Sequence, residues 1–284
     1  MIEPIIALVL SYLETSELIL LCRVETTFKL ITQKYIKEFK LTDAVTSITI
    51  DDIRFLKGVT TINLRNCFQI MDNSLKYLKG VQSIDLSYCY KITDDGLRYL
   101  EGVQSIDLSY CDQITDDGLK YLKGVQRINL AYCSKITDRG LEYLKGVYAI
   151  NLCGIGQITD CGLEYLRGVH TINLSNCRLI TDDGLEYLRG VNTIYLSGCV
   201  RIRDRGLEYL RGVREIYLYG CGITDRGLEY LKGVHTIDLS CCRGITAWGL
   251  GNLKDVRSIN LSGCSQIKNI PGFEWVAGAN IMVP

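Results

Sequence analysis

One unit of about 22 residues recurs along most of the chain, and this repeat limits the folds that the sequence can adopt. A leucine occupies the same point of every copy, with a spacing of 22 residues except for one step of 21. These leucines are Leu64, Leu86, Leu108, Leu130, Leu152, Leu174, Leu196, Leu218, Leu239 and Leu261. A cysteine follows three positions later in nine of the ten copies, Ile155 being the exception. Repetition at such a period indicates a stacked array of repeats.

Each copy combines the pattern of a short strand with that of a short helix. An isoleucine precedes each leucine by two positions, and this alternation is typical of a strand, whereas Leu97 and Leu100 have the spacing of a helix face. Thr93 and Asp94 offer a cap and a negative charge where that helix begins. One copy buries too little apolar surface to offset the cost of ordering its backbone, so the copies must stack. Strands about 4.8 Å apart and helices about 10 Å wide predict a solenoid with its strands on the concave face.

The pattern L-x-x-L-x-L-x-x-[N/C], followed by I-T-D and G-L-x-x-L, resembles the leucine-rich-repeat family, in particular its cysteine-containing subtype. The resemblance implies an α/β solenoid with parallel strands on the concave face and short helices on the convex face. Its repeats are shorter than those of that subtype. We expect the solenoid at 41–284, with a half repeat at 41–58, repeats at 59–267 and a cap at 268–284, where Phe273, Trp275 and Val276 can cover the last repeat.

Residues 1–40 do not fit the repeat and show helical spacing of apolar residues. We predict three short helices there, the second beginning after 14–17 and the third covering 33–39. The stretch IIALVLSYLETSELILLCRVETTFKLI, residues 5–31, resembles an F-box motif. It lacks the usual opening Leu-Pro, since Ile2 holds the proline position, and the usual Val-Cys reads Val24 and Glu25.

The F-box resemblance implies that residues 1–40 bind the adaptor Skp1 of a cullin ubiquitin ligase and that the chain selects a protein substrate for it. Carried over by position, the Skp1 contacts are Ile5, Ile6, Val9, Leu10, Leu13, Leu18, Leu21, Val24 and Phe28. The alternative is a stand-alone leucine-rich-repeat module whose N-terminal helices only seal the stack.

A partner is expected on the concave face, where side chains beside the Ile-x-Leu core point to solvent and differ from copy to copy. The candidate partner-binding residues are Asp85, Tyr88, Asp107, Tyr110, Tyr132, Tyr148, His170, Tyr195, Arg214, Glu215, Tyr217 and Tyr219. Tyrosine and arginine are favoured anchors of protein interfaces. The alternative is that the tyrosines only pack between repeats. A second set, from Tyr77 to Tyr230 on the helix side, recurs without change and is interpreted as packing.

Catalysis, metal binding and cofactors have little support in the sequence. His170 and His235 fall three repeats apart, roughly 14 Å by strand spacing, so they cannot share a metal ion. Cys153 and Cys161 lie outside the repeated cysteine position but lack a paired histidine. The other repeat cysteines are expected to be free thiols that donate weakly to backbone, which implies a reducing compartment, cytoplasmic or nuclear. Lys plus Arg and Asp plus Glu are equal at 32 each, so neither nucleic acid nor membrane is expected as a partner, and we expect a monomer outside its complex.

Overall fold

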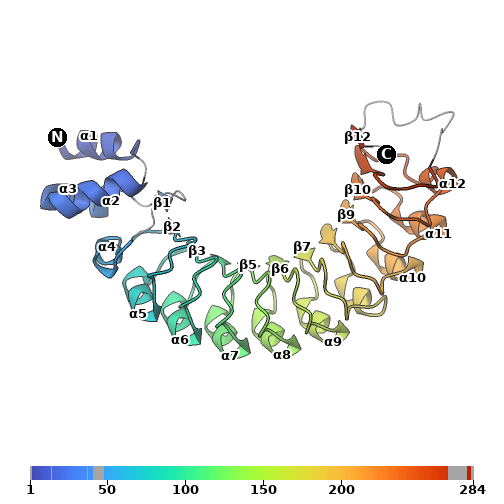
Figure 1. Cartoon of the computed structure of the whole chain (residues 1–284), viewed down its shortest axis with the longest axis horizontal. Coiled ribbons are helices and arrows are strands. Elements are labelled where there is room, and N and C mark those ends of the chain that lie inside the picture. The colour runs from blue at the N-terminus through green and yellow to red at the C-terminus, as the bar shows by residue number, and fades with distance from the viewer. Residues whose placement is uncertain (1, 14, 37, 41–47, 268–279, 283–284) are drawn as a thin grey trace. The chain divides into compact units, whose positions relative to one another are not determined.

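The computed structural model describes residues 2–13, 15–36, 38–40, 48–267 and 280–282. The chain divides into two compact units, Met1–Lys135 and Ile136–Pro284. This division falls in the turn between a strand and a helix of one repeat, and the expected boundary at residue 40 stays a prediction. In each unit the strands line one side and the short helices the other (Figure 1).

The first unit begins with three helices. They are α1 (Ile2–Leu10), α2 (Thr15–Val24) and α3 (Thr26–Tyr35). Helix α3 packs against both others, and Ile19 and Ile31 are buried among them. The predicted third helix at 33–39 was wrong. Glu25 ends the second helix and accepts a hydrogen bond from Thr27 N at 3.2 Å, so α3 starts at Thr26 and a strand follows it.

Repeats fill the rest of the first unit. Its strands are β1 (Glu38–Lys40), β2 (Thr61–Asn63), β3 (Ser83–Asp85), β4 (Ser105–Asp107) and β5 (Arg127–Asn129). Its helices are α4 (Ile50–Phe55), α5 (Asp72–Leu75), α6 (Asp94–Leu97) and α7 (Asp116–Leu119), the last three continued by the 3-10 turns Lys76–Leu78, Arg98–Leu100 and Lys120–Leu122. The strands pair in parallel and in sequence order, with Ile62, Ile84 and Ile106 in register. Helix α4 lies within the predicted half repeat at 41–58, whereas β1 precedes that range and pairs with β2.

The second unit continues the same pattern. Its strands are β6 (Ala149–Asn151), β7 (Thr171–Asn173), β8 (Thr193–Tyr195), β9 (Glu215–Tyr217), β10 (Thr236–Asp238), β11 (Ser258–Asn260) and β12 (Asn280–Met282). Its helices are α8 (Asp138–Leu141), α9 (Asp160–Leu163), α10 (Asp204–Leu207), α11 (Asp225–Leu228) and α12 (Ala247–Leu250), with 3-10 helices at Glu142–Leu144, Glu164–Leu166, Gly184–Leu188, Glu208–Leu210 and Glu229–Leu231. Strand β12 pairs in parallel with β11. This strand was not predicted from the sequence, and the proposed covering residues Phe273, Trp275 and Val276 lie outside the described part of the chain.

Two hydrogen-bonded ladders join successive repeats. The Asp72 carboxylate accepts from Thr93 N at 2.8 Å and from Thr93 Oγ1 at 2.7 Å, which ties the start of α5 to the start of α6. This aspartate–threonine ladder continues at Asp94–Thr115, Asp138–Thr159, Asp160–Thr181, Asp204–Thr224 and Asp225–Thr246. The repeated cysteines form the second ladder. Cys89 Sγ donates to Leu64 O at 3.2 Å, which confirms the predicted donor role, and burial raises the pKa of this thiol to about 12.

The single 21-residue step has a physical explanation in the second unit. The turn after Cys221 is one residue shorter than the others, and Arg203 replaces the cap threonine of the preceding repeat. The Nη1 atom of Arg203 donates to Val200 O at 2.7 Å and to Ile202 O at 2.8 Å. A Cβ atom on Gly222 would lie 2.7 Å from that Nη1. Glycine and the short turn therefore leave room for the guanidinium.

Candidate protein-interaction surfaces

The N-terminal segment exposes an apolar stripe along α1 and the turn that follows it. Ile5, Leu8, Val9 and Tyr12 stand at positions i, i+3, i+4 and i+7, and each has more than half of its surface exposed. Val24 at the end of α2 is 86% exposed. Leu8, Tyr12, Leu20 and Leu30 are exposed but were absent from the predicted contact set. The helical spacing from Ile5 to Tyr12 was the signal that could have found the first two.

The predicted Skp1 contacts do not all face outward. Ile6, Leu13, Leu21 and Phe28 are half-buried. Leu10 and Leu18 are each only 3% exposed. The prediction that these two residues contact Skp1 is wrong, because their side chains fill the interior of the helical segment and cannot contact a partner while that segment stays folded.

A part-buried ion pair joins the helical segment to the first repeat. Arg23 on α2 reaches Asp52 on α4 at 2.8 and 2.6 Å, and Asp52 also caps α4 through Thr49. Burial alone would raise the pKa of the Asp52 carboxyl. The hydrogen bonds from Arg23 and Thr49 outweigh that effect and hold this pKa below its usual value.

The strand face of the first unit carries two adjacent carboxylates. Asp85 and Asp107 are register partners on β3 and β4, and both are half-buried. The donors that reach them are uncharged. Ser87 donates to Asp85 through N at 2.8 Å and Oγ at 2.6 Å. Ser109 does the same for Asp107 at 2.8 and 2.6 Å, and Asn129 Nδ2 reaches the second oxygen of Asp107 at 2.7 Å.

Tyr88, Tyr110 and Tyr132 form a stack that we term the tyrosine ladder. Neighbouring ring centroids lie 4.4 and 4.7 Å apart, and the Arg65 guanidinium lies 5.2 Å from the centroid of the Tyr88 ring. All three tyrosines have left-handed backbone, with φ of 61 to 62°. That conformation costs a residue with a Cβ roughly 1–2 kcal/mol, while each stacked pair returns about 0.5–1.5 kcal/mol.

Two further aromatic residues extend this surface and were missed in the sequence. Phe68 and Tyr90, each about half exposed, stack at 6.0 Å, and Tyr90 meets Tyr88 edge-on at 6.3 Å. They lie in the turns one residue past Cys67 and Cys89, and only the first two copies carry an aromatic residue there. A comparison of turn positions between copies would have revealed them.

In the second unit, the predicted group around Tyr195 contains two separate ring pairs. Tyr195 and Tyr217, on β8 and β9, stack at 4.2 Å. Burial, with the neighbouring Tyr195, raises the pKa of Tyr217 to about 12. Tyr148 stacks on His170 at 4.6 Å in the turns that precede β6 and β7. The remaining members are Glu215, whose carboxylate accepts from Thr193 Oγ1 at 3.5 Å, and the exposed side chains of Arg214 and Tyr219.

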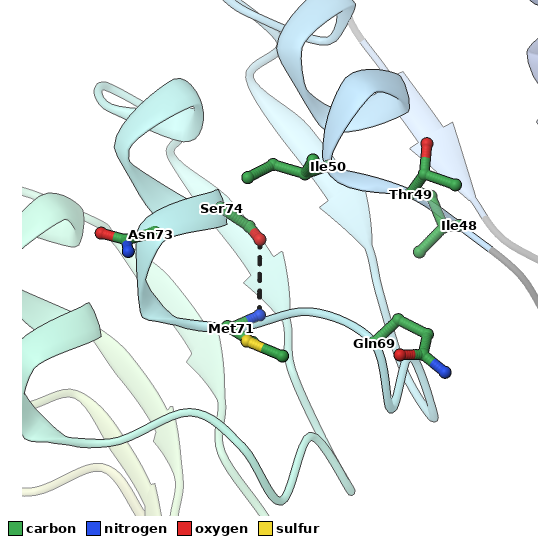
Figure 2. Close-up of a pocket in the computed structure, with 7 residues that line it drawn as sticks. All are labelled: Ile48, Thr49, Ile50, Gln69, Met71, Asn73 and Ser74. Atoms are coloured by element: carbon green, nitrogen blue, oxygen red, sulfur yellow. Dashed lines mark hydrogen bonds between the residues drawn. The ribbon is translucent and has the colours of Figure 1, made fainter.

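A pocket of about 550 Å³ opens in the first unit where the aspartate–threonine ladder is interrupted. Ile50 stands at the position of the ladder aspartate and Met71 at that of the threonine. Ser74 Oγ accepts from Met71 N at 3.4 Å, in place of a carboxylate from the preceding repeat. Figure 2 shows these residues with Ile48, Thr49, Gln69 and Asn73, which complete the lining.

Helix-side tyrosines of the second unit contact basic side chains of the preceding repeat. Lys145 lies 4.9 Å from the ring centroid of Tyr165 in the next repeat, and Arg167 lies 4.6 Å from that of Tyr187. Such cation–π contacts stabilise the packing of one repeat on the next.

The described residues offer little support for metal binding or catalysis. Among them, no three His, Cys, Asp or Glu side chains cluster closely enough to hold a metal ion. None of the helices in the described part of the chain has the length and apolar character needed to cross a bilayer. Cys153 is half-buried and Cys161 is exposed.

Comparisons with known proteins agree with this architecture. Residues 103–123 and 169–188 match the family model described as Leucine Rich repeat. None of the curated protein sequences compared with the chain matches it significantly. Rad7, solved in its complex with Elc1 in yeast, is 16% identical with a TM-score of 0.57, over 99% of this chain and 90% of that chain.

Two further solved structures are similar. An internalin from Listeria monocytogenes has a TM-score of 0.61 and 16% identity, over 89% of this chain and 88% of that chain. TLR13, solved in complex with ssRNA13, has a TM-score of 0.57 and 16% identity, over 80% of this chain and 40% of that chain. With the register-matched parallel strands, short helices and buried leucines, these likenesses show that the chain has the leucine-rich-repeat solenoid fold, which typically serves as a binding scaffold.

Proposed function

We propose that the chain is a substrate-recognition subunit of a Skp1-cullin-F-box ubiquitin ligase. Helices α1 to α3 bind a Skp1-like adaptor, and the strand face binds the protein to be modified. The observation that carries this proposal is the exposed stripe of Ile5, Leu8, Val9 and Tyr12 on α1 and the turn that follows it. A segment that only sealed the solenoid would turn its apolar residues toward the first repeat, whereas a contiguous exposed stripe suits a partner.

The Rad7 structure supports a protein-binding role. Rad7 has a similar fold over 99% of this chain, and it was solved in complex with Elc1. The buried cysteine thiols suit a reducing compartment, so we place the protein in the cytoplasm or nucleus.

Capture of purified Skp1 by the folded protein tests the proposal. Val9→Asp and Val24→Asp place a charge on exposed positions of α1 and α2, so both variants should fold. Both should no longer bind Skp1. Trp248→Asp is the control, because Trp248 is 90% exposed but lies in the second unit. Failure of the unmodified protein to retain Skp1, or equal retention by the Val9 and Val24 variants, would contradict the proposal.

The second candidate is a stand-alone binding module with an N-terminal cap. The Arg23–Asp52 pair favours it, because a cap has to be fixed to the first repeat. The same capture experiment separates the two, since a cap would retain no adaptor.

A further inference from the structure

The tyrosine ladder occupies a turn position at which the second unit carries no tyrosine. The corresponding residues there are Gly154, Asn176, Gly198, Gly220, Cys241 and Gly263, all with left-handed backbone. Glycine and asparagine adopt this conformation readily, whereas tyrosine is strained in it. The turn therefore does not require the ladder. Strain of this kind clusters where a protein presents side chains to a ligand.

Both faces of the Tyr88 and Tyr110 rings are already covered. Tyr110 stacks between Tyr88 and Tyr132, and Arg65 stacks on Tyr88. Tyr88 and Tyr110 thus present ring edges and hydroxyl groups. A nucleobase binds an aromatic side chain through its face, so this arrangement disfavours single-stranded nucleic acid. Edges and hydroxyls suit an extended polypeptide, which offers aliphatic stems and backbone hydrogen-bonding groups.

The charge beside the ladder restricts the polypeptide further. Asp85 and Asp107 stand in register on β3 and β4, the strands that lead into the turns of Tyr88 and Tyr110. Like charges on neighbouring strands repel each other, and a cation held between them would relieve that repulsion. Because the donors to both carboxylates are uncharged, their negative charge remains for a ligand.

We propose that the tyrosine ladder and the two carboxylates bind an extended segment of a partner protein through its arginine or lysine side chains. A guanidinium or ammonium group would lie at Asp85 and Asp107, and its aliphatic stem would cover the ring edges of Tyr88 and Tyr110. This inference deepens the proposed function, since it rests on the strand face as the substrate-binding surface and names the chemistry of the substrate segment.

The test measures binding of a fluorescent arginine-rich peptide to the full chain, with a citrulline peptide of otherwise identical sequence as the neutral probe. The unmodified protein should bind the arginine peptide about tenfold more tightly, equivalent to ~1.4 kcal/mol, and added salt should weaken that binding. Tyr110→Asn should weaken the binding of both peptides, because arginine and citrulline share the aliphatic stem that covers the ring edge of Tyr110. Asparagine already occupies this position, with the same backbone, at Asn66 and Asn176.

A second variant, Asp85→Asn with Asp107→Asn, should remove the preference for the arginine peptide while keeping the hydrogen bonds from Ser87 N and Ser109 N. Asn63 and Asn129 already make the equivalent bonds to backbone N–H groups in this unit. Asn176→Gly, at the ladder position of the second unit, is the matched control and should bind as the unmodified protein does. Thermal unfolding of each variant verifies that it is folded.

Equal binding of the two peptides would overturn the inference, as would full affinity in folded Tyr110→Asn or displacement of the peptide by oligouridylate. Skp1 capture is a separate readout. If the protein binds the arginine peptide but does not capture Skp1, the ligase role is contradicted and this inference stands. If it captures Skp1 but shows no preference for the arginine peptide, this inference is contradicted and the ligase role stands.

Discussion

Arg23 donates two hydrogen bonds to the carboxylate of Asp52, from Nε at 2.8 Å and from Nη2 at 2.6 Å. The same carboxylate accepts from Thr49 N at 2.6 Å and Thr49 Oγ1 at 2.7 Å where α4 begins. Asp52 is 2% exposed. One buried carboxylate therefore joins the helical segment to the first repeat, and the orientation of the proposed adaptor-binding helices depends on it.

Asp52→Asn should destabilise this junction. The amide cannot match the charge of Arg23, and it replaces an acceptor with a donor that faces the donors of Thr49 and Arg23. Because Arg23 is partly exposed, we expect a loss of about 2 kcal/mol, below the value for a fully buried pair. Urea unfolding measures the loss, and hydrogen exchange should locate it in α1 to α3. Glu3→Gln, which removes the exposed pair with Lys34, is the control and should change neither readout. Unchanged exchange in Asp52→Asn would contradict the assigned role.

The same pair should make the junction sensitive to acid. The hydrogen bonds hold the pKa of Asp52 below its usual value despite its burial. A depressed pKa contributes stability above the unfolded pKa of about 3.9, and that contribution disappears as pH falls through the lower, folded pKa. Protection of α1 to α3 should therefore be constant near neutral pH and decline below about pH 4. In Asp52→Asn this part of the decline should be absent, and hydrogen exchange at a series of pH values would detect it.

The repeat could be read from the sequence because its determinants are local. Isoleucine and leucine alternate in each strand, Thr93 caps its helix as predicted, and the cysteine position recurs in register. The start of α3 depended on a cap by Glu25, a residue outside the preferred N-cap types. Strand β12 pairs with β11, but Val283 stands at the position of the repeated leucine, so periodicity alone could not identify this strand.

The candidate surfaces were less predictable because they depend on which side chains the fold turns outward. Leu10 and Leu18 match the positions of an adaptor-binding motif but are buried by the packing of three helices, which apolar spacing does not specify. The tyrosines at 88, 110 and 132 were found by comparing copies of the repeat. Their left-handed backbone and mutual stacking required the coordinates.

Gly96→Ala should destabilise the first unit through the aspartate–threonine ladder. A Cβ atom at this position would lie 2.5 Å from Asp72 Oδ1, so the carboxylate would have to leave Thr93. We expect a loss of about 1–3 kcal/mol, typical of overpacking. The chain itself carries Ser74 at the equivalent position, where the preceding repeat has Ile50 instead of an aspartate.

Two controls sharpen that measurement. Gly156→Ala should leave unfolding unchanged, because a Cβ atom at Gly156 would meet nothing within 4 Å. Asp72→Ala combined with Gly96→Ala should cost less than the sum of the two single changes, since the clash disappears with the carboxylate. Additive losses in urea unfolding would show that the glycine is not required by the ladder.

Cysteine alkylation should separate ladder thiols from surface thiols. The ladder cysteines are buried and donate to carbonyl groups of the preceding repeat, and burial raises the pKa of Cys89 and Cys199 to about 12. Thiolate is the reactive form, so these residues should resist iodoacetamide in the folded protein at neutral pH. Cys161 and Cys241 are exposed and should be labelled first. Mass spectrometry of peptides from native and urea-unfolded protein gives the order, and rapid labelling of Cys89 in the native state would mean that the repeats open far more readily than their buried hydrogen bonds allow.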